Sequence, residues 1–172
     1  LSIHASGKDG VNNSGLLQGN NNKISSSGSL INDGTIRASS NLDITASSVK
    51  NTKEITSGNG IDISVEKGLF NSGDRAIISA DKSISVVKNN KNVTASFENN
   101  DNAILQSGDT LLINNINNIS NSGLIIAKGN TTIKNGDSLV NNKGQLQGGT
   151  INIEKITTID SKNGSGITAS DN

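Results

Sequence analysis

The sequence predicts an all-β fold, a parallel β-helix, which is a solenoid of about eight short coils. Three observations lead to this prediction. A phrase made of an apolar residue, Asn, a turn and an alternating apolar pair recurs about every 20 residues. The apolar residues that follow each phrase alternate with polar ones, as in strands with one buried face. No segment keeps the i, i+3, i+4 apolar spacing of a helix.

An asparagine anchors each copy of the phrase, most clearly in the form Asn-Ser-Gly or Asn-Asp-Gly. The anchors are Asn13, Asn32, Asn51, Asn71, Asn100, Asn121, Asn142 and Asn163. Successive anchors lie 19, 19, 20, 29, 21, 21 and 21 residues apart, which sets coils of 19–21 residues with one longer interval. Equivalent residues of a parallel β-helix stack about 4.8 Å apart. We therefore expect these asparagines to form a ladder of side-chain amides at one corner of the coil.

The composition agrees with a narrow core of stacked rows. The 172 residues include 28 Asn, 25 Ser and 19 Gly but no Pro, Cys, Met, Trp or Tyr, and the only aromatic residues are Phe70 and Phe97. A leucine-rich repeat has a similar period, but its fixed leucines and helical segment are not visible. The repeats run through residues 1–172, and the residues from Leu1 onward show neither the charged region nor the apolar region of a signal peptide. We expect a single solenoid segment excised from a longer protein.

The repeat is interrupted once, between Asn71 and Asn100. Most of the additional residues fall in "VVKNNKNVTASFENN", residues 86–100. Insertions in solenoids form loops or hairpins on one face, which is often the binding face. This excursion is expected to be either a tolerated loop or a functional protrusion. In the second case the candidate contact residues are Lys88, Lys91, Asn92 and Phe97.

Few residues of the sequence indicate catalysis or the binding of a metal ion or nucleic acid. Lys and Arg number 15, as do Asp and Glu, so there is no electrostatic footprint for nucleic acid. No stretch approaches 18 apolar residues, so no membrane span is expected. His4 is the only histidine and lacks partners for a catalytic dyad or a metal site. Asp43 and Asp62 share a position in adjacent coils, but the acidic row stops there, which favours outward strand residues over a calcium site. We expect no catalytic residue, metal or cofactor, and no enzyme activity.

Two stretches resemble a known repeat. They are "NDGTIRASSNLDITASSVKN", residues 32–51, and "NSGLIIAKGNTTI", residues 121–133. Both are similar to the haemagglutinin repeat of filamentous haemagglutinin, found in large exoproteins of two-partner secretion in Gram-negative bacteria. The resemblance implies a right-handed β-helix, secreted or displayed at the cell surface after export through an outer-membrane pore. It carries over no functional residue beyond the structural Asn and Gly.

The resemblance implies a structural and adhesive role. The expected function is that of a shaft segment of an adhesin, which spaces or presents a region that binds a host-cell or bacterial surface receptor or glycan. An alternative is a receptor-recognition section of a contact-dependent growth-inhibition exoprotein, in which the excursion makes the contact. A third and less favoured alternative is a β-helix that binds or degrades polysaccharides.

Overall fold

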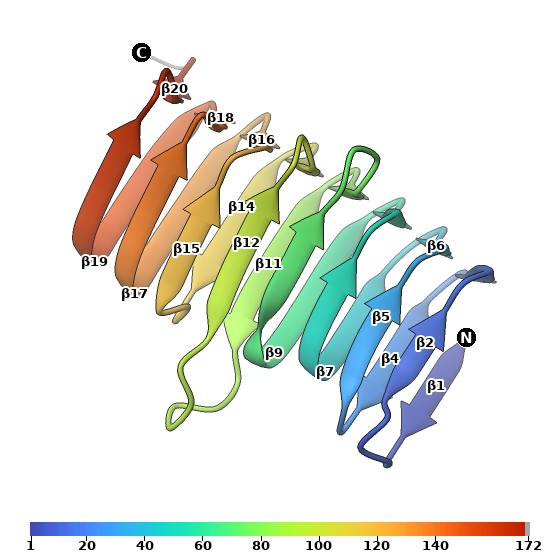
Figure 1. Ribbon diagram of the computed structural model, residues 1–172. Helices are drawn as coiled ribbons and strands as arrows, with labels where there is room; N and C mark the ends of the chain where they lie inside the picture. The colour runs from blue at the N-terminus through green and yellow to red at the C-terminus, as the bar shows by residue number, and fades with distance from the viewer. Residues whose placement is uncertain (171–172) are drawn as a thin grey trace.

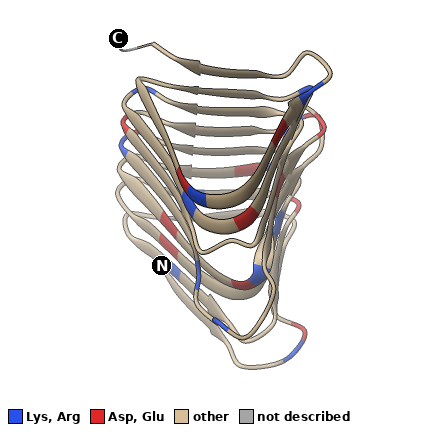
Figure 2. Cartoon of the chain, turned by 90° about the vertical axis from the view of Figure 1, so that its left-hand side faces the viewer, with Lys and Arg blue, Asp and Glu red and all other residues tan. Residues whose placement is uncertain are grey.

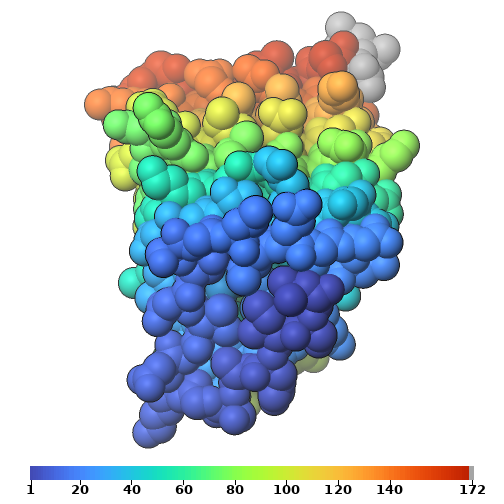
Figure 3. Space-filling view, turned by 90° about the vertical axis from the view of Figure 1, so that its right-hand side faces the viewer, coloured from blue at the N-terminus to red at the C-terminus, as the bar shows by residue number. Residues whose placement is uncertain are grey.

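The computed structural model describes residues 1–170, and the chain in this range forms strands and turns with no helix. Twenty strands wind into eight stacked coils, and every recorded strand pair is parallel (Figure 1). The coils follow one another as layers from the first residues to the last (Figure 3). The predicted fold class, an all-β parallel solenoid, is confirmed.

Each coil contributes to three faces. The first two belong to one sheet and meet at a bend, and the third is a separate sheet. In four coils a single long strand runs through the bend, so that each coil is V-shaped when viewed along the stack (Figure 2). These long strands are β7 (Leu42–Asn51), β9 (Gly60–Ser72), β17 (Asn130–Asn142) and β19 (Thr150–Lys162).

The remaining strands each lie on one face. The first face adds β1 (Ser2–Ala5), β4 (Asn22–Ser26), β11 (Ser83–Lys88) and β14 (Thr110–Asn114). The second face adds β2 (Val11–Asn13), β5 (Ser29–Asn32), β12 (Ser96–Asn100) and β15 (Asn118–Asn121). The third face, called the outer sheet below, consists of β3 (Leu16–Gly19), β6 (Thr35–Ala38), β8 (Glu54–Ser57), β10 (Ile77–Ala80), β13 (Ile104–Ser107), β16 (Leu124–Ala127), β18 (Gln145–Gly148) and β20 (Gly166–Ala169).

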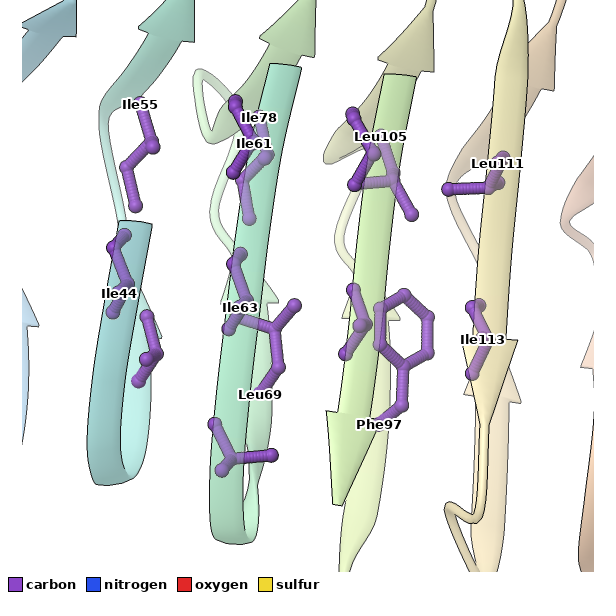
Figure 4. Packing of buried hydrophobic residues seen from close by; sticks show 14 of the residues in the cluster. Ile44, Ile55, Ile61, Ile63, Leu69, Ile78, Phe97, Leu105, Leu111 and Ile113 are labelled. Atoms are coloured by element: carbon purple, nitrogen blue, oxygen red, sulfur yellow. The ribbon is translucent and has the colours of Figure 1, made fainter. Parts of the chain in front are cut away.

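Stacked apolar rows from the three faces fill the interior. The first face supplies Ile24, Ile44, Ile63, Val86, Ile113 and Ile133 in consecutive coils. The second supplies Leu30, Val49, Leu69, Phe97, Ile119 and Leu139, and the outer sheet supplies Ile36, Ile55, Ile78, Leu105, Ile125 and Leu146. All of these side chains are at most 1% exposed, and Figure 4 shows part of their packing. Branched aliphatic residues suit such rows because they pack well on a pleated surface.

The excursion predicted for residues 86–100 is shorter than expected. Lys88 pairs with Val65 and Ser96 with Gly68, so residues 89–95 stand where the preceding coil has only Glu66 and Lys67. The last of them, Ala95, is fully buried and stays bonded to the next coil, because its carbonyl oxygen accepts from the backbone N–H of Asn117 (3.1 Å). We call residues 89–95 the inserted loop; it extends beyond the edge of the solenoid in Figure 1. The prediction of Phe97 as a contact residue is wrong. Its side chain is fully buried between those of Leu69 and Ile119, because the register places it on the inward side of β12.

Candidate functional site: the asparagine ladder and the inserted loop

A row of buried asparagines lies at the corner between the second face and the outer sheet. Each Nδ2 donates a hydrogen bond to the Oδ1 of the asparagine one coil further along. The bonds are Asn13 to Asn32 (2.7 Å), Asn32 to Asn51 (2.7 Å), Asn51 to Asn71 (2.8 Å), Asn71 to Asn99 (2.8 Å), Asn99 to Asn121 (3.0 Å) and Asn121 to Asn141 (2.9 Å). The ladder predicted from the sequence therefore exists, and it continues across the coil that carries the inserted loop.

The ladder also joins the corner to the backbone of the next coil. The same Nδ2 group donates to the carbonyl oxygen of the first residue of the next outer-sheet strand, as from Asn71 to Ile104 (3.0 Å) and from Asn121 to Gln145 (3.2 Å). Each amide group of the ladder thus has partners for its donor and its acceptor. This matters because a buried polar group without a partner costs about 1–3 kcal/mol.

Two predicted ladder positions are wrong by one residue. The ladder uses Asn99 and Asn141, whereas the sequence-based prediction chose Asn100 and Asn142, which are only half-buried. The error arises in the turns, which contain additional residues here. Asp101, Asn102 and Lys143 have φ angles of 55°, 65° and 65°. Because these turns are longer, the asparagine closest to the turn glycine or aspartate is not the one that stacks.

The last predicted anchor, Asn163, lies outside the ladder. Ser161 occupies the position that stacks on Asn141. Asn163 is exposed and donates from Nδ2 to Oδ1 of Asn142 (2.6 Å). The sequence offers only a partial signal, since each ladder residue follows an apolar residue of the second face by two positions, as in Phe97-x-Asn99. At the later turn this pattern is ambiguous, because Leu139-x-Asn141 and Val140-x-Asn142 both fit it.

The inserted loop is held at its base by one side chain, Asn117. Its Oδ1 accepts hydrogen bonds from Nζ of Lys88 (2.8 Å), before the loop, and from the backbone N–H of Ala95 (3.1 Å), the last loop residue. Its Nδ2 donates to Oδ2 of Asp137 in the following coil (2.9 Å). The two ends of the loop are therefore joined through the coil that follows them.

The predicted contact residues of the excursion differ in their surroundings. Lys91 and Asn92 are exposed, and the backbone N–H of Asn92 donates to Oδ1 of Asn90 (3.0 Å), which forms a local turn. Lys88 is half-buried and bonded to Asn117 as described. Of the four residues predicted there, only Phe97 is removed from the surface.

The stacked carboxylates predicted from the sequence, Asp43 and Asp62, do face outward in adjacent coils. Lys23 precedes them in the row and Ser85 follows. Partial burial, and secondly the charge of Asp43, raise the pKa of Asp62 above its ordinary value. Within residues 1–170, no three His, Cys, Asp or Glu side chains are grouped so that they could hold a metal ion.

Asp62→Asn is expected to stabilise the protein at neutral pH. A raised pKa in the folded state means that the ionised carboxylate is disfavoured there. This penalty is present above the folded-state pKa and is lost as the pH falls through it towards the unfolded-state value. The melting temperature of the variant should be higher than that of the wild type at pH 7, and the two melting temperatures should be equal at about pH 3. Asp81→Asn removes the same charge at an exposed turn and is the matched control. If the difference in melting temperature between Asp62→Asn and the wild type were the same at both pH values, the interpretation would be contradicted.

The outward side of the outer sheet is a candidate binding surface that the sequence did not reveal. All four glutamines of the chain, Gln18, Gln106, Gln145 and Gln147, lie at its outward positions, together with Ile77, Ile104, Leu124 and Ile126. Shallow hollows of about 430 Å³ and 320 Å³ lie along it, lined among others by Ile126 with Gln147 and by Leu124 with Gln145. The alternation that separates outward from buried residues is hidden where Leu124, Ile125 and Ile126 are all apolar.

Among residues 1–170 there is no helix with the length and apolar character needed to cross a membrane. Comparison of the chain with protein-family models, with curated proteins and with solved structures finds no significant match.

Proposed function

We propose that this chain is a shaft segment of a secreted or surface-displayed bacterial adhesin of the filamentous haemagglutinin type. In this role it spaces or presents a region that binds a receptor or glycan on a host cell or a neighbouring bacterium. The observation that carries the proposal is the unbroken ladder from Asn13 to Asn141, with three apolar rows parallel to it. From Asn13 to Asn141 each coil presents the same features to the next, so the length of the rod is set by the number of coils.

The contacts also suit export of an unfolded chain through an outer-membrane pore. Each strand pairs with the equivalent strand of the coils directly before and after it. In such a structure folding can begin anywhere and propagate from coil to coil. A chain that emerges gradually from a pore can therefore fold as each new coil becomes available, without waiting for distant parts of the sequence.

The second candidate function is the receptor-recognition section of a contact-dependent growth-inhibition exoprotein. It is favoured by the inserted loop, which is held in place by Asn117 and carries the exposed residues Lys91 and Asn92. A β-helix that binds or degrades polysaccharides is a third candidate, for which the amide-rich outward side of the outer sheet provides the surface.

Cell binding by the purified, labelled segment tests the first two candidates. A variant in which Glu-Lys replaces residues 89–95 is the control, because Glu66 and Lys67 make the same connection in the preceding coil. Saturable binding to epithelial or bacterial cells that disappears in this variant would support recognition by the loop. Binding that persists would place the contact elsewhere on the rod, and no saturable binding by either folded protein would leave only the spacing role.

Removal of one coil tests the rod itself. Deletion of residues 32–50 joins Ile31 to Asn51, which then takes the position of Asn32 in the ladder, 19 residues earlier. The shortened protein is expected to fold, with unchanged far-UV circular dichroism per residue and a length reduced by about 4.8 Å in small-angle scattering. Deletion of residues 32–44, which removes part of a coil, is the control and is expected to prevent folding. Equal behaviour of the two deletions would contradict the modular rod.

A further inference from the structure

A small pocket lies between the inserted loop and the bend of the two following coils. Its volume is about 190 Å³, and it is lined by Lys88, Asn89, Lys91, Asn115 and Asn135. It thus joins three coils: the one that carries the loop and the next two along the stack. None of the lining residues is acidic, and two of the five carry a positive charge.

The walls of the pocket are held by contacts outside it. Asn115 and Asn135 occupy equivalent places at the bend, with φ angles of 59° and 58°, a left-handed conformation that asparagine tolerates better than most residues. Nδ2 of Asn135 donates to Oδ1 of Asn114 (2.8 Å), and the backbone N–H of Asn115 donates to the carbonyl oxygen of Lys134 (3.1 Å). On the loop side, Asn117 holds Lys88 and Ala95. A ligand would therefore enter a formed site and would not need to order the loop, which lowers the cost of binding.

The lining groups indicate the chemistry of the ligand. Two lysines without an acidic residue among them favour an anion, and a carboxylate can accept hydrogen bonds from both ammonium groups. The three asparagine side chains both donate and accept, as neighbouring hydroxyl groups require. The volume is below the roughly 300–1,000 Å³ of pockets that enclose a drug-sized ligand, so the site suits one small ring.

We propose that this pocket binds a single sugar residue that carries a carboxylate, of the uronic acid class. The carboxylate lies between Lys88 and Lys91, and the ring hydroxyls face Asn89, Asn115 and Asn135. The proposal rests on the proposed function, because it names the ligand class that the inserted loop would recognise on a cell surface.

Titration of the ¹⁵N-labelled protein with glucuronic acid, followed by NMR, tests the proposal. Saturable shifts are expected at the lining residues, with a dissociation constant on the order of millimolar, as for a single small group. Glucose, which lacks the carboxylate, and acetate, which lacks the ring, are the matched ligands and should bind at least about fivefold more weakly. Equal binding of glucose would overturn the role of the charge, and equal binding of acetate would overturn the role of the ring.

Substitutions separate the site from general charge effects. Lys91→Gln is expected to weaken glucuronic acid binding at least about fivefold, because a hydrogen bond between an ammonium group and a carboxylate is stronger than one between neutral groups, although solvent at an exposed side chain reduces the difference. Lys82→Gln, in an exposed turn between β10 and β11, removes the same charge and should leave binding unchanged. Equal effects of the two substitutions, or no effect of Lys91→Gln, would overturn the proposal. The titration needs no cells, so its failure can be told apart from a failure of cell binding.

Discussion

Asn99→Leu is expected to lower the free energy of unfolding by about 3 kcal/mol or more. Leucine has a similar size but cannot hydrogen-bond. Oδ1 of Asn121 would lose its donor, and the carbonyl oxygens of Ala103 and Leu124 would lose the Nδ2 group that now bonds to them. Asn99 is fully buried, and each buried polar group left without a partner costs about 1–3 kcal/mol. Urea unfolding, with the midpoint and the slope fitted together, measures the change.

Asn100→Leu is the matched control for this experiment. Asn100 differs from its neighbour in direction, since it is only half-buried and its Nδ2 contacts Oε2 of Glu98 (3.1 Å). We expect a change within about 0.5 kcal/mol, as is usual for surface positions. If the two variants were equally stable, or if Asn100→Leu were the more damaging, the assignment of the ladder to Asn99 would be wrong.

Phe97→Ala is expected to cost about 3–5 kcal/mol, the usual range for removal of a fully buried phenylalanine ring. The ring lies among the aliphatic rows (Figure 4). The strand register places Leu69 on one side of it and Ile119 on the other. Its loss leaves a cavity that branched aliphatic neighbours with restricted rotamers fill poorly. The measurement is again equilibrium unfolding in urea, together with thermal melting.

Phe70→Ala provides the comparison, because it removes the other aromatic ring of the chain. Phe70 is half-buried on the outward side of β9, between Lys50 and Glu98 in the row. A loss of about 1 kcal/mol or less is expected, from the part of the ring that is covered. Similar losses for the two variants would contradict the inward position of Phe97. The pair also separates stability from recognition, since neither ring should affect the pocket beside the inserted loop.

Asn99→Leu and Phe97→Ala each probe a row of side chains that runs through successive coils. In a solenoid each repeat contacts only its neighbours, so stability is approximately the sum of repeat and interface contributions. A defect in the fifth coil, which holds both Asn99 and Phe97, divides the rod into two parts of about equal length. A large loss of stability in either variant would show that the coil with the inserted loop is well packed, as the proposed shaft role requires.

The architecture of this protein could be predicted from its sequence because the signal is repeated. One coil of alternating apolar residues is ambiguous, but eight copies at intervals of about 20 residues allow few other folds. The same repetition predicted the ladder residues Asn13, Asn32, Asn51, Asn71 and Asn121 correctly. The stacking of Asp43 on Asp62 followed from the same period. In each case the interaction joins equivalent residues of adjacent coils, and the spacing of these residues can be read from the sequence.

The tertiary structure alone decided features that depend on register at irregular places. Between Asn99 and Asn100, and between Asn141 and Asn142, one residue of difference reverses the direction of the side chain, because strand residues alternate between the two sides. The turn lengths that set this choice became visible only in the strand pairing. The inward position of Phe97 also depended on the strand register, because the sequence placed this residue within an expected excursion. The pocket beside the inserted loop could not be predicted either, because its walls come from three coils.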